Sequence, residues 1–451
     1  MPDLQRPIRD VSNSAAPPLA YGIEERPDRL SSCVLYGWQH TLVDISPFVL
    51  PLAVAAALGF NGGEVARLIN FGLFAMGVAT LLQTTVGNRL PIIQGPSATL
   101  AGTLAPVAGL AGGPAMWGAV FAGGLAEAAI GLFGLPGRLR RHFPASVAGV
   151  VVLTIGLSLG KVAISLSVGD GGPKNFLYAG GAIALIFVLQ VGAAGMGGGV
   201  LSRASIFIAI WVVGLGAGGV LGDVDWKLIA AKPWLEVPSL FPFGGPGFGW
   251  EFSLAAVLGV FAGYLGSMVE SIGDYTATCA VTGEELRTRH LNRGIFAEGL
   301  GCLAATALGG LPCTSYTQNI GIIATTRVAS RFVVQVAAVI LMLYGLCPKF
   351  GALLAAMPRP VLGGVFLVVC GMIAMSGVRL LAESGSDAGE TLTAGFTLVC
   401  AVGIPYYANF VLGSAWLATI PAGLRLLMTN AVALAVLLGV SLNALLRLLR
   451  R

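Results

Sequence analysis

The sequence predicts an all-α protein that crosses a membrane many times. Its mean hydropathy is +0.84, and only 10% of its 451 residues are charged, whereas soluble proteins carry about 25%. Apolar runs recur along the chain, and each spanning helix needs about 20 such residues. The 65 glycines suit closely packed or broken helices in lipid. We therefore predict a polytopic protein of the plasma membrane.

Fourteen apolar segments can be placed, seven in each half of the chain. The first seven cover residues 33–58, 66–86, 91–104, 114–135, 144–165, 176–195 and 202–221. The second seven cover residues 252–280, 294–310, 313–326, 330–348, 359–380, 391–411 and 418–445. The third and tenth segments are too short to span as regular helices.

The first 32 residues differ from the rest, because they contain five prolines and no apolar stretch. A secretory signal requires such a stretch, so we expect a mobile cytosolic tail at residues 1–32. Lysine and arginine favour the cytosolic side of short loops. With the N-terminus inside, 18 of the 26 basic residues fall on the cytosolic side. This orientation also places the C-terminus in the cytosol.

The two halves of the chain share a repeated sequence pattern. Leu90-Pro91 precedes the third segment and Leu311-Pro312 precedes the tenth, an offset of 221 residues. Because seven is an odd number of spans, the two repeats are inverted relative to each other in the membrane. Inverted repeats with a short, Gly/Pro-interrupted segment at matching positions are typical of secondary transporters, which bind substrate near the midplane.

The third segment offers the first candidate site. Gly95 and Pro96 separate an extended stretch ending at Gln94 from a half-helix that starts near Ser97 and Ala98. The free N–H groups and positive dipole end of such a helix hold a carbonyl oxygen or an anionic edge. The alternative is a kinked span with no role in binding.

The tenth segment is a polar stretch in apolar surroundings, running from Gln318 to Arg327. The amides of Gln318 and Asn319 carry both donors and acceptors, which suits a planar heterocycle with alternating N–H and C=O groups. Gly321 follows, and the alternative role for the amides is an interhelical hydrogen bond. Thr326 and Arg327 close the segment at the cytosolic face, as a guard of the inner exit or as an interface anchor.

Two carboxylates in the eighth segment are candidates for proton coupling. Glu270 and Asp274 are four residues apart, on one face of a helix, and their apolar surroundings supply no cation for a structural ion pair. Gln39 and His40 lie in the first segment. His40 is either a hydrogen-bonded packing residue or a group that tunes Glu270.

Several classes of function are disfavoured. There is no Walker sequence, so ATP-driven transport by this chain alone is not expected. Neither a nucleophile elbow nor metal-ligand spacing occurs, so we predict no enzyme, no metal and no cofactor other than a coupling ion. The net charge of +5 follows the membrane topology and does not indicate a nucleic-acid partner.

These residues resemble the nucleobase/ascorbate transporter family. Its signature is Gln/Glu/Pro-Asn-x-Gly-x-x-x-x-Thr-Arg/Lys/Gly, and every defined position is matched between Gln318 and Arg327. The Gln39-His40 pair matches the family's first span, and Glu270 with Asp274 matches its eighth. The resemblance runs from about residue 33 to 440.

The resemblance implies an architecture of fourteen spans in two inverted repeats. It implies a core domain at 33–135 and 252–348, a gate domain at 136–221 and 349–451, and an outer loop at 222–251 between them. Family members are commonly homodimers that move substrate by an elevator-like motion. Carried over, the substrate-binding residues are Glu270, Gln318, Ser97 or Ala98, and Gly321 with its neighbour Asn319. Gln39, Gln94, Thr326 and Arg327 are implied in gating or support.

The first signature residue also bears on the substrate. In this family Gln at that position favours xanthine or urate, and Asp274 resembles the purine branch, whereas Ile320 departs from many xanthine and urate carriers. We expect proton-coupled uptake of xanthine or urate through Glu270, Asp274 and His40. The alternatives are a uracil symporter, a sodium-coupled ascorbate transporter, or an anion channel or exchanger of sulfate permease-like fold. The expected partners are a nucleobase, the lipid bilayer and a second copy of the chain.

Overall fold

The chain is built almost entirely of helices in a computed structural model, which describes residues 19–44, 49–136, 145–192, 202, 204–243, 249–383 and 387–450. The first half contains α1 (Leu30–Asp44), α2 (Leu50–Leu58), α3 (Gly62–Thr85), β1 (Gln94–Pro96), α4 (Ala98–Leu132), α6 (Ala145–Val168), α7 (Pro173–Phe187), η3 (Val188–Gly192), α9 (Ser205–Ala209), η4 (Ile210–Ala217), α10 (Gly218–Val220) and α11 (Trp226–Ala230). The second half contains α12 (Leu254–Thr282), α13 (Thr288–Ala307), β2 (Cys313–Ser315), α14 (Thr317–Thr326), α15 (Arg331–Gly345), α16 (Pro348–Ala355), α17 (Arg359–Glu383), α18 (Ala388–Tyr407), η6 (Ala408–Leu412), α19 (Gly413–Thr419), α20 (Ala422–Thr429) and α21 (Ala431–Leu449).

Local sequence signals explain several helix ends. Asn61 caps α3 by accepting the N–H groups of Gly63 and Glu64, and the Glu64 carboxylate accepts the Asn61 N–H at 2.8 Å. This reciprocal arrangement satisfies N–H groups that have no partner inside the helix. As an example of a C-terminal signal, α12 is followed by Gly283, whose φ of 70° is the left-handed conformation that glycine adopts without steric cost.

Within the described residues, eight helices are long and apolar enough to cross a membrane. A ninth span results if α15 and α16, which meet at a bend of 74°, count as one broken span. The chain is therefore a multi-pass membrane protein. The number fourteen stays a prediction, because several predicted segments form pairs of shorter helices rather than one span.

The structure corrects several segment boundaries. Residues 33–58 contain two helices, α1 and α2, and residues 45–48 lie outside the described part. The segment predicted at 330–348 ends in the bend before α16, and the one predicted at 418–445 breaks at Asn430, between α20 and α21. Mean hydropathy alone does not mark these breaks, although Pro348 begins α16 and Asn430 caps α21, which are both local helix-start signals.

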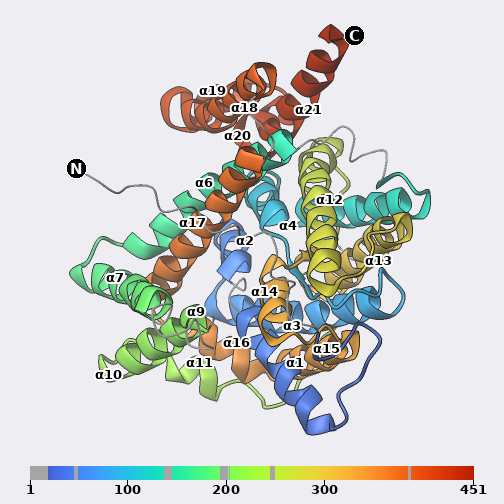
Figure 1. The fold of residues 1–451 in the computed structure, drawn as a ribbon. Helices are drawn as coiled ribbons and strands as arrows, with labels where there is room; N and C mark the ends of the chain where they lie inside the picture. Colours follow the sequence, from blue (N-terminus) through green and yellow to red (C-terminus); the bar gives the residue numbers. More distant parts are fainter. Residues whose placement is uncertain are drawn as a thin grey trace, which may run out of the picture.

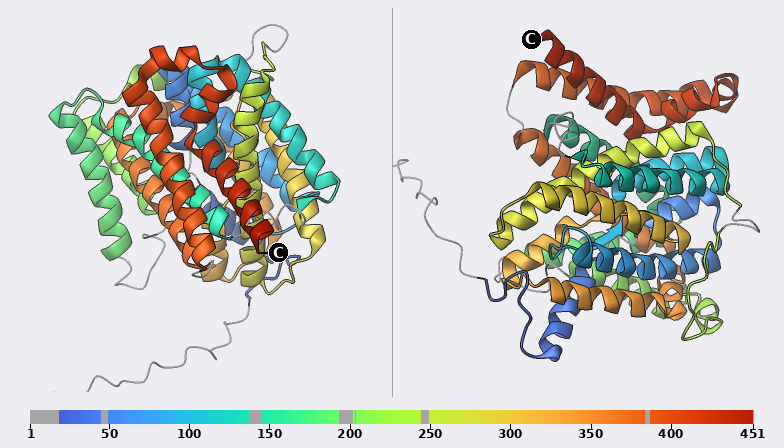
Figure 2. Two further views of the ribbon diagram at one scale, coloured as in Figure 1. Left: turned by 90° about the horizontal axis from the view of Figure 1, so that it is seen from above. Right: turned by 90° about the vertical axis from the view of Figure 1, so that its right-hand side faces the viewer.

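The helices pack in two groups. In one, α6 lies along α17, while α21 contacts α6 and α18; in the other, α4 packs on α12 and α13, and α3 packs on α13 and α15. Figure 1 places α18–α21 at the opposite end of the molecule from α1 and α15, and the right-hand view of Figure 2 shows the same separation. The groups meet where α12 touches α20 and α21. The division of the chain into core and gate domains stays a prediction.

Residues 19–29, here named the N-terminal strap, differ from the expected mobile tail. Tyr21 forms a parallel β-bridge with Val328, in the link between α14 and α15. The side chain of Ile23 packs against an apolar cluster that includes Leu90 and Ile272. The strap is thus joined to the helices, whereas residues 1–18 of the predicted tail lie outside the described residues.

Candidate functional site

The two short segments predicted after Pro91 and Pro312 form a buried pair of strands, which we name the crossing. β1 and β2 are antiparallel, with Gln94 opposite Ser315 and Pro96 opposite Cys313. Gln94 and Ser315 are separated by the repeat offset of 221 residues that the prolines indicated. Two further backbone bonds flank the pair, from Ser97 N–H to Pro312 O and from Tyr316 N–H to Ile93 O, both at 3.0 Å. The crossing therefore brings the starts of α4 and α14 together.

The predicted half-helices begin where the sequence indicated. Ser97 has extended backbone angles and caps α4, its Oγ accepting the Leu100 N–H at 3.2 Å. α14 follows Tyr316 without a side-chain cap. The first turn of a helix has N–H groups without intrahelical partners and a partial positive charge. Both half-helices therefore direct hydrogen-bond donors toward the crossing.

The two carboxylates of α12 each approach one half-helix. Thr99, in the first turn of α4, donates its hydroxyl to Glu270 Oε2 at 3.0 Å. Thr317, the first residue of α14, donates its hydroxyl to Asp274 Oδ1 at 2.8 Å. The spacing of four residues thus places one carboxylate at each helix start, a location that favours negative charge.

An open polar face lies along α12 and α14. Gln318 and Gly321 are both exposed and three residues apart, so they share one face of α14. A methyl group built on Gly321, or on Gly273 of α12, would meet nothing within 4 Å. Glu270 and Ala98 are partly exposed. Glu270, Gln318, Gly321 and Ala98 are thus at least partly accessible beside the two half-helix starts, and we name them the open face.

Asn319 points to the opposite side of α14. It is fully buried, and its Nδ2 donates to the Pro91 carbonyl oxygen at 2.8 Å. His40, on α1, is also buried, and its Nδ1 has no hydrogen-bond partner among the described residues, while Gln39 beside it is partly buried. In this conformation Asn319 joins α14 to the entry of β1. Its role as a substrate ligand, and that of His40 in proton coupling, stay predictions.

The remaining predicted residues support the crossing or lie away from it. Gln94 is buried; its Nε2 donates to Ser315 Oγ at 3.0 Å, and its backbone N–H donates to Thr80 Oγ1. Thr326 and Arg327 are at the far end of α14, where Thr326 donates to the Ile322 carbonyl and Arg327 adopts a left-handed φ of 59°. Gln94 therefore joins the two repeats, while Thr326 and Arg327 are separated from the open face by the length of α14.

Sequence reasoning missed a buried carboxylate on α13. Glu298 is 1% exposed and accepts hydroxyl groups from Ser271 at 2.7 Å and Tyr275 at 2.9 Å. Ser271 also lies 2.9 Å from Thr314 of β2. Glu298 thus holds α12 against the back of the crossing. An ionisable residue inside an apolar segment marks a functional site by default, and that signal was present in the run Ala297-Glu298-Gly299.

A second buried carboxylate, Glu127, lies on α4. It is fully buried, and Cys302 of α13 donates its thiol to Glu127 Oε2 at 3.5 Å. Its other carboxylate oxygen has no hydrogen-bond partner among the described residues. The same signal, a lone glutamate in the run Leu125-Ala126-Glu127-Ala128, could have identified it.

Comparison with solved structures shows the fold. The transmembrane domain of a cyanobacterium bicarbonate transporter, BicA, aligns with 93% of this chain and 99% of its own, with a TM-score of 0.56 and 16% identity. The murine anion transporter Slc26a9, in its inward-facing state, aligns with 94% of this chain and 69% of its own, with a TM-score of 0.61 and 12% identity. At these identities the likeness concerns the arrangement of helices alone.

Comparison of sequences shows the family. A family profile described as a permease family matches residues 31–410. The uric acid permease PucK of Bacillus subtilis (strain 168) is 35% identical over 80% of this chain and 84% of its own. The xanthine permease XanQ of Escherichia coli (strain K12) is 31% identical over 96% of this chain and 95% of its own. The chain therefore belongs to the nucleobase/ascorbate transporter family, whose members are permeases and not enzymes.

Proposed function

We propose that this permease carries xanthine or urate into the cell together with protons. The observation that supports it most is the open face, where Glu270 approaches the start of α4 and Gln318 lies in the first turn of α14. An oxopurine presents N–H donors and carbonyl acceptors around a flat ring. The Glu270 carboxylate accepts N–H groups, the Gln318 amide pairs with another edge, and free N–H groups of α4 or α14 hold a carbonyl oxygen. Similarity to uric acid and xanthine permeases supports the same substrate class.

Proton coupling is proposed from the carboxylates of α12. Asp274 is 5% exposed, and its Oδ2 has no hydrogen-bond partner among the described residues. A buried oxygen that carries charge without a partner is costly, so a proton on Asp274 removes that cost. Arrival of the proton then changes the charge beside Glu270, one helical turn away. His40, which is buried on α1 with no partner for its Nδ1 among the described residues, is proposed as a second group in the coupling.

The proposal includes the setting in which the carrier works. It lies in the plasma membrane with both termini in the cytosol, and works as a homodimer in which the core moves against the gate. A carrier of inorganic anions, the activity that the titles of the two structural neighbours give, is disfavoured because Gln318, and not a cation, stands at the start of α14, while Arg327 lies at the far end of that helix.

Uptake measurements with two variants test the substrate site. In cells without their own purine carriers, Glu270→Gln and Gln318→Ala are expected to abolish uptake of labelled xanthine or urate while the protein still reaches the membrane. Each variant removes hydrogen bonds to the substrate that are worth about 1 kcal/mol or more. The loss is larger for Glu270→Gln, because the wild-type carboxylate is charged, than for Gln318→Ala. Uptake equal to the wild type in either variant would show that the site is wrongly assigned.

Thermal unfolding of the purified protein ranks the ligands. A ligand present at 100 times its Kd stabilises the folded state by about 2.7 kcal/mol. We expect xanthine or urate to raise the melting temperature, and uracil, ascorbate and bicarbonate to leave it unchanged. A shift with only one of the latter compounds would replace the proposed substrate.

Loss of uptake with a protonophore but not on sodium removal would support proton coupling, and the reverse would contradict it.

A further inference from the structure

The N-terminal strap is bonded along its backbone to the link that follows α14. Ala20 N–H donates to the Arg327 carbonyl oxygen at 2.8 Å, and Ala329 N–H donates to the Tyr21 carbonyl oxygen at 2.8 Å. Farther along, Arg331 N–H donates to the Ile23 carbonyl oxygen at 3.0 Å. This ladder fixes residues 327–331, which connect the polar half-helix α14 to α15.

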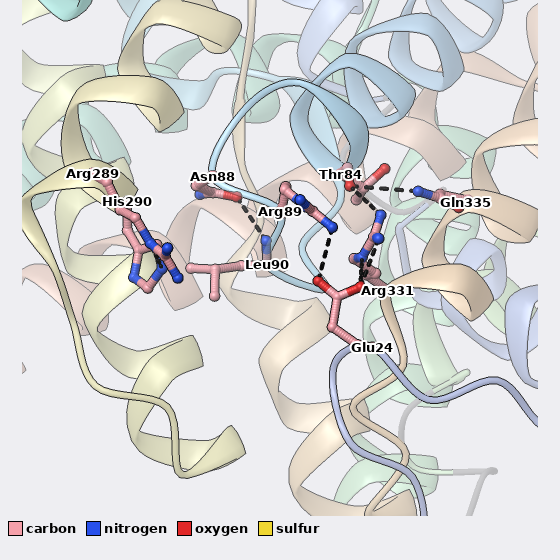
Figure 3. A network of polar contacts seen from close by, with 9 residues as sticks. All are labelled: Glu24, Thr84, Asn88, Arg89, Leu90, Arg289, His290, Arg331 and Gln335. Atoms are coloured by element: carbon pink, nitrogen blue, oxygen red, sulfur yellow. Dashed lines mark hydrogen bonds and ion pairs between the residues drawn. The ribbon is translucent and has the colours of Figure 1, made fainter.

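Glu24, in the middle of the strap, is shared by two arginines from distant parts of the chain (Figure 3). Its Oε1 lies 3.1 Å from Arg89 Nη2, and its Oε2 lies 2.6 Å from Arg331 Nη2. Arg331 also donates to the Thr84 carbonyl oxygen at 3.2 Å. Arg89 precedes β1 and Arg331 follows α14, so one carboxylate connects the flanks of the two crossing segments.

The strap contacts two residues with strained backbones. Arg89 and Arg327 have φ angles of 63° and 59°, and Phe241 is the other non-glycine residue with positive φ in the described part. Such a conformation costs an L-residue about 1–2 kcal/mol and persists only where the surroundings impose it. The Glu24 carboxylate contacts the side chain of Arg89, and the Ala20 N–H donates to the carbonyl oxygen of Arg327.

An apolar contact and a cation–π contact also anchor the same strap. Ile23 packs on the cluster that contains Leu90, Ile92 and Ile272, and the guanidinium of Arg26 lies 4.2 Å from the ring centre of Phe332, on α15. Leu90 and Ile92 lead into β1, while Ile272 lies between Glu270 and Asp274 on α12. The strap therefore contacts the entry of β1, the link that follows α14 and the cluster that includes Ile272 of α12.

We propose that Glu24 is a positioning residue, which acts through Arg331 and Arg89 to hold α14 and the entry of β1 in the register that substrate binding needs. Gln318 is at one end of the ten-residue helix α14 and the strap fixes the other. A helix anchored at both ends presents Gln318 at a fixed distance from Glu270. Without the anchor, part of the binding energy is spent on ordering α14.

The test uses the full-length purified protein and three variants. Glu24→Gln keeps the shape of the side chain and removes its charge, and Glu24→Asp keeps the charge on a shorter side chain. The matched control is Asp28→Asn, which removes an exposed acid from the same strap. The first readout is hydrogen exchange of the amides of residues 317–331 without ligand, and the second is the Kd for xanthine and urate.

We expect Glu24→Gln to speed exchange at residues 317–331 and to raise the Kd severalfold. Glu24→Asp restores both toward the wild type, and Asp28→Asn changes neither. Unchanged exchange in Glu24→Gln overturns the proposal, as does a raised Kd without faster exchange. If Glu24→Gln does not fold, Arg89→Gln, which removes one of the two ion pairs, is measured in its place under the same criteria.

The affinity readout rests on the proposed function, whereas the exchange readout does not. A wild-type protein that binds neither xanthine nor urate contradicts the proposed substrate, and the exchange difference between Glu24→Gln and Asp28→Asn still decides whether the strap positions α14.

Discussion

At the scale of single residues, the crossing depends on buried carboxylates that face hydroxyl groups. The Glu298 carboxylate accepts hydrogen bonds from the hydroxyl groups of Ser271 and Tyr275. The Tyr275 hydroxyl oxygen in turn accepts a hydrogen bond from Gln83 Nε2 at 2.8 Å. Each member of this chain comes from a different helix or from a different turn of α12. Because buried hydrogen-bond networks are costly when one partner is missing, a single substitution affects the whole assembly behind β2.

Glu298→Gln is predicted to destabilise the protein by about 1–3 kcal/mol. An amide has one acceptor oxygen where the carboxylate has two, and its NH₂ group faces donors. The measurement is thermal unfolding in detergent, with uptake recorded in parallel. Glu127→Gln is the control, since Glu127 has only a thiol donor at 3.5 Å; we expect a smaller loss of stability. Equal effects of the two substitutions would contradict the role given to Glu298.

The sequence was sufficient to predict some of these residues and not others. Glu270, Asp274 and Gln318 could be predicted because they share a helix face or a compact motif. Glu298 could not be assigned a partner, since Ser271 and Ser315 approach it only after α12, α13 and β2 pack together. The buried orientation of Asn319 likewise depends on a carbonyl group 228 positions away.

At the scale of elements, the first half-helix was indicated by Gly95 and Pro96, and the second by Pro312, which matches Pro91 of the first repeat. Gly95 and Pro96 end the extended entry, and the matching break before α14 lies one repeat offset later. The bend between α15 and α16 and the break at Asn430 were missed because the prediction followed the apolar pattern, although Pro348 begins α16 and Asn430 caps α21 by accepting the Ala433 N–H. Such breaks are set by contacts with neighbouring helices, as where Asn70 Oδ1 accepts the Gly351 N–H at 2.7 Å.

Gly95→Ala is predicted to disrupt the crossing. A methyl group on Gly95 would overlap the ring of Tyr316, whose hydroxyl donates to the Pro96 carbonyl oxygen at 3.1 Å. Overpacking of this kind costs about 1–3 kcal/mol, and here it displaces the residue that begins α14. The measurement is the Kd for xanthine or urate together with the melting temperature, both of which should worsen.

Gly109→Ala provides the control for that substitution. Gly109 lies inside α4, and a methyl group there would meet nothing within 4 Å. Alanine in a helix interior is more stable than glycine by about 0.5–1 kcal/mol, so stability should stay equal or rise. If Gly95→Ala behaves like Gly109→Ala, the contact with Tyr316 does not constrain the crossing.

At the scale of the whole molecule, the strap makes attachment of the N-terminus depend on pH. Hydrogen bonding from Arg331, with the positive charges of Arg331 and Arg89, holds the pKa of Glu24 below its ordinary value of 4.5. A carboxylate whose pKa is lowered by folding stabilises the folded state above its unfolded pKa and loses that effect as the pH falls through its folded pKa. Glu25 and Arg26 are the charged neighbours in the strap.

The exchange difference between the wild type and Glu24→Gln should therefore be complete at pH 7 and at pH 5.5. It should shrink only below about pH 4.5, the unfolded value. Salt should reduce it at every pH, because the Glu24 side chain is 61% exposed and exposed ion pairs are screened. A difference that is already lost at pH 6 would assign the effect to another group.

The composition and the repeat were enough to predict a multi-pass helical carrier, and the signature was enough to predict its family. The packing of α6 along α17 and of α4 on α13 could not be derived, since apolar helix faces in lipid differ little from one another. The strap was missed for a similar reason: a proline-rich segment without an apolar core carries no periodic signal, and its order comes from backbone bonds to residues 327–331.

The antiparallel pairing of β1 with β2 has a consequence for the energetics of a transport cycle. Because the pairing joins the two half-helix starts by backbone hydrogen bonds, we expect the proposed ligand-binding groups to move together in a transport cycle. The cargo would then meet the same set of partners from either side of the membrane. In a carrier of the proposed kind the gradients alone decide which way net flux runs, so we expect the pairing to affect the rate of transport and not its direction.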